Sequence, residues 1–270
     1  MSLDSTAPPV AASVAIVTGA GSGIGLGTAL KLAEAGMCVL GVGRDPHKLA
    51  AMADRIGNPA QVETLALDIT LNEAPARIMQ AAEARWGRVD YLINNAGLGS
   101  PKPLHETDDD NLDHFLDVML RAPFRLAREA VTRLQPGGAI INVSSIFAVV
   151  GGLRGGAYAA AKAGLDGLTR HIACQYGALG IRANSVAPGV TVTPMVEHRL
   201  DDPVFRRMNT EVTPHTRLGR VEDIASTIAF LCSPGGSFIN GQVIVVDGGW
   251  STTKYLSEFG RTSVWTAAAE

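Results

Sequence analysis

Tyr158 and Lys162 stand four residues apart in a stretch that reads Tyr-Ala-Ala-Ala-Lys. On a helix this spacing places both side chains on one face, one turn apart. A phenol has an ordinary pKa of about 10, and a neighbouring ammonium favours its ionised form, so the pair suits acid–base chemistry near neutral pH. Ser145, thirteen residues before the tyrosine, could hold a substrate oxygen. The same spacing also occurs in ordinary half-exposed helices, so this interpretation depends on the other motifs.

A glycine-rich run lies near the start of the chain. Residues 13–18 are apolar and β-branched, which predicts a buried parallel strand, and the run GAGSGIG follows at 19–25. Glycines let a ligand approach the backbone closely, and the N-terminus of the next helix offers free N–H groups to a phosphate. The order strand, glycine loop, helix therefore predicts a dinucleotide site. A purely structural glycine turn is the alternative.

The next predicted strand, residues 37–42, ends at Gly43-Arg44-Asp45. In NAD-binding folds a carboxylate at this strand end binds the ribose hydroxyls, whereas an arginine accommodates a 2′-phosphate. Counting from the glycine loop places Gly43 in the acidic slot and Arg44 directly after it. This favours NADP(H), because a guanidinium pairs with phosphate. If the turn is longer, Asp45 fills the slot and the cofactor is NAD(H); Arg44 as a plain surface charge is a third interpretation.

Polar residues follow several other predicted strands, at 62–67, 89–93, 138–143 and 181–187. Carboxyl ends of parallel strands share the edge where open α/β sheets bind ligands. Asp68 at such an end is expected either to reach an adenine amino group or to cap a helix. The run Asn94 to Gly97 is expected to brace the sheet beside a cofactor. Ser144 and Ser145 emerge together at the end of the fourth of these strands.

Helices are predicted at 46–56, 71–86, 107 to about 134, from the glycine loop before Tyr158 to about 180, and at 222–231, with a last strand at 243–246. Pro123 is expected to kink the long third helix. The acidic run Asp108 to Asp110 suits the start of that helix better than it suits metal ligands, so no metal site is predicted.

Composition indicates a globular protein with a large core: 270 residues, 46% hydrophobic, 18% charged, with a mean hydropathy of +0.16. A net charge of −3 without basic clusters gives no reason to expect nucleic acid or a membrane surface as partner. Cys38, Cys174 and Cys232 have no metal-binding spacing, which predicts reduced core residues in a reducing compartment, the cytoplasm.

The domain organisation follows from the same pattern. Residues 1–12 are expected to form a flexible tail, and residues 13–249 one Rossmann-type domain. The irregular segment 191–221 is expected to carry substrate specificity. The tail 250–270 contains Trp250, Tyr255, Phe259 and Trp265, so it is expected to pack on the body or on a neighbouring subunit.

Taken in order, the motifs resemble those of the short-chain dehydrogenase/reductase family over residues 13–249. They are TGAGSGIG at 18–25, NNAG at 94–97, Ser145, YAAAK at 158–162 and PGVTVT at 188–193. The resemblance implies an α/β, three-layer, doubly wound Rossmann-type fold with a seven-stranded parallel sheet. It also implies a nicotinamide cofactor and a homo-oligomer, a dimer or tetramer.

The resemblance further implies a role for each motif residue. Tyr158 is expected to be the general acid–base and Ser145 to orient the substrate oxygen, with Ser144 the less favoured serine. Lys162 is expected to hold the nicotinamide ribose and lower the pKa of the tyrosine. Adenine, ribose and carboxamide contacts are assigned to Asp68 and Ile69, to Asn95, Ala96 and Gly97, and to Thr191 and Thr193. The full set of predicted cofactor-binding residues is Gly19, Ser22, Gly23, Ile24, Gly25, Arg44, Asp68, Ile69, Asn95, Ala96, Gly97, Tyr158, Lys162, Pro188, Gly189, Thr191 and Thr193.

One position departs from the family pattern. Where the family often has an asparagine that helps hold a water linked to the lysine, this chain reads Val118-Met119-Leu120. A methionine side chain makes no comparable hydrogen bond. The relay either persists through the backbone carbonyl of Met119 or is weakened.

These observations predict an oxidoreductase that moves a hydride between NADP(H) and a small ketone or secondary alcohol. An NAD(H)-dependent enzyme of the same fold is the nearest alternative, and a non-catalytic nucleotide sensor is a remote one. Arg154 and Arg199 lie near the expected mouth of the site, either to pair with an anionic substrate group or as surface charges.

Overall fold

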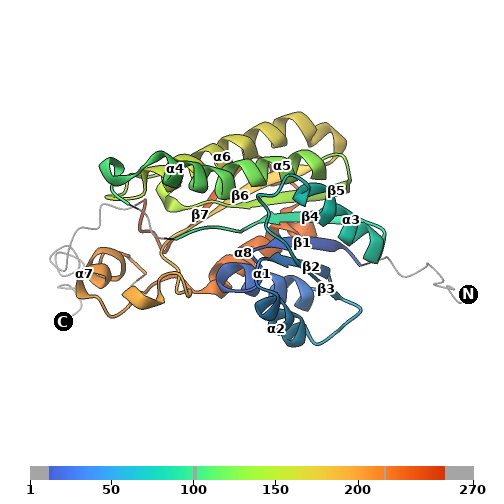
Figure 1. Ribbon diagram of the computed structural model, residues 1–270, viewed down its shortest axis with the longest axis horizontal. Coiled ribbons are helices and arrows are strands. Elements are labelled where there is room, and N and C mark those ends of the chain that lie inside the picture. Colours follow the sequence, from blue (N-terminus) through green and yellow to red (C-terminus); the bar gives the residue numbers. More distant parts are fainter. Residues whose placement is uncertain (1–11, 100–101, 216, 253–270) are drawn as a thin grey trace, which may run out of the picture.

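The computed structural model describes residues 12–99, 102–215 and 217–252 (Figure 1). Seven parallel strands form one sheet in the order β3-β2-β1-β4-β5-β6-β7. The seven-stranded parallel sheet is therefore confirmed. The order reverses between β1 and β4, which is the switch point where such sheets bind ligands. The strands are β1 Val14–Thr18, β2 Cys38–Gly43, β3 Val62–Ala66, β4 Val89–Asn94, β5 Leu134–Val143, β6 Arg182–Pro188 and β7 Val243–Val246.

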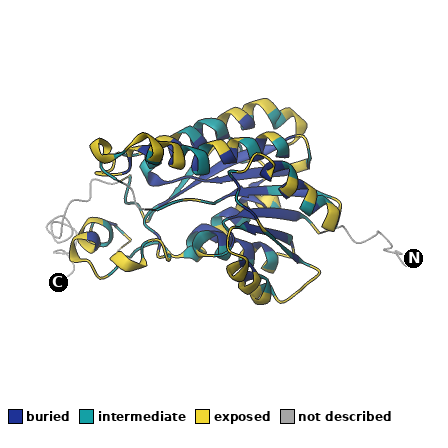
Figure 2. Cartoon of the chain, in the orientation of Figure 1, coloured by how far each residue is buried: buried dark blue, intermediate teal, exposed yellow. Residues whose placement is uncertain are grey.

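Helices cover both faces of the sheet and complete three layers, as Figure 1 shows. Each face has its own apolar cluster beneath its helices, and Figure 2 shows the buried strands between helices that are exposed on their outer sides. Strands enclosed in this way tend to be apolar on both faces, and β1 and β7 show this as short apolar runs in the sequence. One face carries α1 Gly23–Glu34, α2 Pro46–Ile56 and α8 Val221–Leu231; the other carries α3 Ala74–Trp86, α4 Asp109–Leu116, α5 Ala122–Ala130 and α6 Gly156–Tyr176.

The long helix predicted from 107 to about 134 is wrong in its extent. Asp108 caps α4 by accepting from the Asn111 N–H, as the acidic run predicted, but the helix widens into a π-helical turn at Asp117–Arg121. Pro123 has no N–H to give to the carbonyl four residues earlier, which accounts for a π-helical turn where the α-helix would otherwise continue. After α5, Leu134 already belongs to β5, four residues before the predicted start of that strand.

The described residues of segment 191–221 form three short helical turns beyond the carboxyl edge of the sheet, where α7 marks the segment in Figure 1. They are η5 Glu197–Arg199, α7 Pro203–Arg206 and η6 Arg207–Glu211. Trp250 packs edge-on against Phe147, with ring centroids 6.2 Å apart, and its indole N–H donates to the Met208 carbonyl at 3.3 Å. The first aromatic residue of the predicted tail thus joins the body to this segment. Tyr255, Phe259 and Trp265 lie outside the described residues.

The cysteines are only partly as predicted. Cys232 is buried, and burial raises the pKa of its thiol to about 12. Cys38 is partly buried and Cys174 is exposed, so the prediction of a core position is wrong for Cys174. None of the helices in the described part of the chain combines the length and apolar character that crossing a membrane would require.

The Thr18 hydroxyl ties the ends of β1 and β4 together. It donates to the Ile93 carbonyl at 3.2 Å and accepts from the backbone N–H groups of Asn95 and Ala96 at 3.0 and 3.1 Å. The Asn95 side-chain amide donates back to the Thr18 carbonyl at 2.9 Å. The predicted brace is therefore present, and it fixes the backbone at the switch point.

Replacing Thr18 by valine is expected to lower the free energy of unfolding by about 1–3 kcal/mol, because two N–H groups lose their acceptor in a buried place. Urea unfolding followed by circular dichroism measures the change. Thr132→Val removes a hydroxyl from an exposed position and should cost less than about 0.5 kcal/mol. Equal effects in the two variants would contradict a bracing role for Thr18.

Candidate active site

Tyr158 and Lys162 lie on the first turns of α6, which begins after Gly155 in a left-handed conformation with φ of 88°. The Lys162 ammonium donates to the Val143 carbonyl at the end of β5, with an Nζ–O distance of 2.6 Å. The same Nζ lies 5.9 Å from the centroid of the Tyr158 ring. The spacing of four thus brings the two side chains together on one helix face, as predicted, and aims them at the carboxyl edge of the sheet.

Ser145 reaches the same place from the strand end. It is 5% exposed, and its Oγ accepts from the Phe147 N–H at 3.1 Å, which starts a short turn, η3 Ile146–Ala148. Burial raises the pKa of Tyr158, and hydrogen bonding with the Ser145 hydroxyl acts in the opposite direction. The phenol therefore stays protonated at neutral pH and has a proton to donate.

The pKa of Lys162 is also shifted from its ordinary value. Burial lowers the pKa of Lys162 to about 8, and the nearby charge of Asp166 opposes that fall. The expectation of a lowered pKa for Tyr158 is not met, because desolvation by burial is the largest influence on the phenol and raises its pKa.

Ser144 faces away from the tyrosine. Its single hydroxyl proton has two acceptors within reach, the Lys162 carbonyl at 3.5 Å and the carboxyl group of Asp166. Behind it a buried chain of polar side chains runs across the sheet, from Asn94 to Asn142 at 2.9 Å and on to Thr169 at 2.7 Å. These contacts hold the ends of β4 and β5 against α6.

The glycine loop lies against two of the other motifs. A Cβ on Gly25 would come within 2.2 Å of the Gly19 carbonyl oxygen and 2.4 Å of the Asn95 amide nitrogen. A Cβ on Gly23 would meet the Thr193 side chain at 3.3 Å. The loop, the NNAG run and the PGVTVT run therefore meet at one place, although they are far apart in the sequence.

This place fits the pyrophosphate of a dinucleotide. Ser22 stands at the N-cap of α1, yet its side chain makes no capping hydrogen bond, so the first N–H groups of the helix are left for an anion. Gly19 and Gly23 have positive φ angles of 68° and 52°, which side chains rarely adopt. At the far end, Pro188 closes β6 and Thr191 is buried, with its hydroxyl donating to the Gly189 carbonyl.

The residues expected to contact the adenosine part of the cofactor differ in whether their side chains already have hydrogen-bond partners within the protein. Arg44 is exposed, immediately after β2, and its charge reaches the Asp68 carboxylate. Asp45 caps α2, where the N–H groups of Lys48 and His47 lower its pKa. Asp68 accepts from the backbone and side chain of Thr70 at 2.9 and 2.8 Å, so it forms a local turn and the helix-cap interpretation is wrong.

Ile69 and Met119 are both buried. The Ile69 side chain lies in the apolar cluster beneath α3, α5 and α6. Met119, in the π-helical turn, is 1% exposed and belongs to a small cluster that includes Phe115 and the Tyr158 ring. The residue that replaces the family's asparagine thus lies beside the tyrosine.

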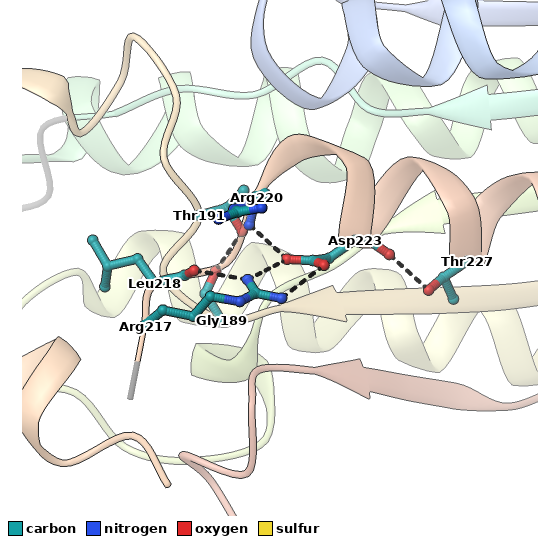
Figure 3. A network of polar contacts seen from close by, with 7 residues as sticks. All are labelled: Gly189, Thr191, Arg217, Leu218, Arg220, Asp223 and Thr227. Atoms are coloured by element: carbon teal, nitrogen blue, oxygen red, sulfur yellow. Dashed lines mark hydrogen bonds and ion pairs between the residues drawn. The ribbon is translucent and has the colours of Figure 1, made fainter. Parts of the chain in front are cut away.

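Segment 191–221 is anchored at its far end by a network that Figure 3 shows. The Arg217 guanidinium binds both oxygens of Asp223 at 2.7 and 3.0 Å, and the Arg220 N–H donates to the same carboxylate at 2.7 Å. The sequence analysis did not predict these interactions of Asp223 with Arg217 and Arg220. The spacing of Arg220 and Asp223, three residues apart at a helix start, was the available signal.

The two arginines predicted near the mouth are both exposed. Arg199 lies over the Phe205 ring at 4.5 Å, within segment 191–221, and Arg154 lies in the loop before α6. Sequence reasoning also missed Asp166, although it follows Lys162 by the same spacing of four that linked the lysine to Tyr158.

Comparison with known proteins agrees with this geometry. Residues 19–251 match the family model described as enoyl-(acyl carrier protein) reductase. The chain is 40% identical over 244 residues to the cis-4-hydroxycyclohexanecarboxylate dehydrogenase of Sinomonas cyclohexanicum, covering 88% of this chain and 96% of that one. It is 36% identical to the levodione reductase of Leifsonia aquatica, over 88% of this chain and 94% of the relative.

A solved structure, the glucose/ribitol dehydrogenase-type short-chain dehydrogenase/reductase of Brucella melitensis, superposes with a TM-score of 0.85 at 31% identity. The match covers 89% of this chain and 97% of the other. Sheet order, site geometry and these matches agree: the chain belongs to the short-chain dehydrogenase/reductase family and is an NAD(P)-dependent oxidoreductase that acts on CH–OH or C=O groups.

Proposed function

We propose that the protein is an NADP(H)-linked carbonyl reductase and secondary-alcohol dehydrogenase with Tyr158 as its general acid–base. The convergence of Ser145, Tyr158 and Lys162 beside the glycine loop carries this proposal. The nicotinamide cofactor supplies or accepts the hydride when bound. The chain's own residues bind that cofactor, orient the substrate oxygen and move the proton.

During reduction, the Ser145 hydroxyl donates a hydrogen bond to the substrate carbonyl oxygen and polarises it. Tyr158 then gives its proton to the same oxygen, and the Lys162 ammonium, one helical turn away, stabilises the phenolate that remains. Oxidation reverses these roles. The ammonium also holds the nicotinamide ribose in this proposal, so both functions require the protonated lysine.

We further propose a ketone or secondary alcohol on an apolar ring as the substrate class. Three exposed apolar side chains lie on segments next to the proposed site: Leu104 beside Gly156 at the start of α6, Met195 beside Gly99, and Leu153 on the loop before α6. Relatives named for a hydroxycyclohexanecarboxylate and for levodione support the choice. A carboxylate on such a ring would pair with Arg154, on the loop before α6, or with Arg199, in segment 191–221.

Tyr158→Phe is expected to lower kcat at least about a thousandfold, because general acid–base catalysis is removed while the ring keeps its packing. The measurement is nicotinamide absorbance decay with a panel of cyclic, acyclic, aromatic and anionic ketones, with cofactor binding followed separately by fluorescence. Cofactor affinity should remain within about threefold. Retained turnover would remove Tyr158 from the mechanism, and silence of the wild type on every ketone, with cofactor bound, would favour the sensor alternative.

Arg44→Ala is expected to weaken NADPH binding by about 10- to 100-fold and NADH binding by less than about threefold, because only the former carries a 2′-phosphate. Titration calorimetry with both cofactors gives the two dissociation constants. Arg55→Ala, at the other end of α2, is the matched control and should change neither. Equal losses for both cofactors in Arg44→Ala would favour the NAD(H)-linked alternative.

A homo-oligomer is part of the proposal, assembled through the outer face of α4, α5 and α6. This face carries an apolar groove of about 490 Å³ with exposed Phe124 at its edge. Phe124→Lys is expected to shift the protein to a smaller assembly in sedimentation velocity, because a charge would be buried in the contact. Leu71→Lys, at a similarly exposed position, is the control. An unchanged assembly in Phe124→Lys would place the contact elsewhere.

A further inference from the structure

Asp166 is a buried carboxyl group that the mechanism above does not use. It follows Lys162 by four residues on α6, so it lies one turn further along the same face of the helix. Both residues are only 4% exposed. Carboxyl groups are almost never buried to this extent without a partner, because removing their charge from water is costly.

The surroundings of Asp166 are polar but incomplete. Hydroxyl groups of Ser144 and Ser185 hydrogen-bond its carboxyl group, and the positive charges that act on it are those of Lys162 and the exposed Arg170. Its Oδ1 atom is buried without a hydrogen-bond partner. This carboxyl group is therefore under-compensated by hydrogen bonds and depends on nearby positive charge.

In the part of the chain that the structure describes, the surroundings of Lys162 lack a negative charge in direct contact with its ammonium. Its ammonium donates to the Val143 carbonyl and lies over the Tyr158 ring, and both groups are uncharged. Met119, which stands where the family often has an asparagine, adds no hydrogen-bonding side chain. Within the described residues, Asp166 is the one carboxyl group whose charge acts on Lys162.

We propose that Asp166 is a positioning residue that keeps Lys162 protonated inside the protein, from the turn of α6 behind it. Burial opposes the charge of each group, and the charge of each favours that of the other. The link to turnover rests on the function proposed above, whereas the electrostatic coupling of the two side chains does not.

The direct test measures the titration of the Lys162 ammonium by NMR in protein labelled with ¹³C at lysine Cε. The chain has five lysines, so the Lys162 signal can be assigned from its loss in Lys162→Met. In the wild type we expect it to titrate near pH 8, well below the ordinary pKa of a lysine, about 10.4. In Asp166→Asn, which keeps the shape but not the charge, the midpoint should fall by at least about 0.5 in pH.

Ser185→Ala is a second variant, in case Asp166→Asn does not fold. It removes a hydrogen bond that favours the ionised carboxyl group, so it should move the Lys162 midpoint in the same direction by a smaller amount. Thr28→Val, a buried hydroxyl on α1 across the sheet, is the control and should leave the midpoint in place. An unchanged midpoint in the folded Asp166 variant, or in Ser185→Ala if it alone folds, would overturn the proposal.

The pH profile of kcat/KM for ketone reduction separates this inference from the proposed function. The ammonium is lost as pH rises through about 8, so reduction should fall over that range in the wild type. The same fall should occur at lower pH in Asp166→Asn, in step with the NMR midpoint. A shifted midpoint with an unshifted profile would leave the coupling intact and show that turnover does not need the protonated lysine.

Discussion

The buried ammonium of Lys162 is the constraint on which the arrangement of the site depends. An isolated charge inside a protein is costly unless polar groups surround it. The end of β5 supplies the Val143 carbonyl, α6 supplies the Tyr158 ring on one side, and Asp166 supplies a carboxyl group on the other. The position of α6 along β5 must therefore stay fixed. The hydrogen bond from the Asn142 side chain on β5 to Thr169 on α6 holds the two elements in that position.

The cofactor side of the site depends on close backbone packing instead of charge. At Gly25 and Gly19 the glycine loop approaches the Asn95 amide so closely that a single methyl group would not fit. The Thr18 hydroxyl, at the end of β1, fixes that approach, because it binds the Ile93 carbonyl of β4 and the Asn95 N–H that follows this strand. The two sides meet because parallel strands deliver both sets of residues to the same sheet edge.

The sequence predicted those features that depend on local spacing and failed where distant contacts decide. The sheet was predictable because its strands carry short apolar, β-branched runs, as in β1, and are followed by polar or glycine residues. The Tyr158–Lys162 pair was predictable because helical periodicity fixes it. The direction in which the pKa of Tyr158 shifts was not predictable, because it depends on how deeply tertiary packing buries the phenol. The early start of β5 at Leu134 depends on pairing with Val89, a partner 45 residues away that no local pattern reveals.

Met119 shows how a departure from a family pattern can be compatible with the same chemistry. Its side chain fills an apolar cluster against the Tyr158 ring, so the position serves packing. Pro123, four residues later, has no N–H to bind the Met119 carbonyl in an α-helix, and the turn from Asp117 to Arg121 is π-helical. A backbone route for the proton relay therefore has a structural basis at this position. An asparagine side chain is uncharged, so it would not have supplied a negative charge to the lysine. That charge comes from Asp166, which lies on α6 on the opposite side of Lys162 from the tyrosine.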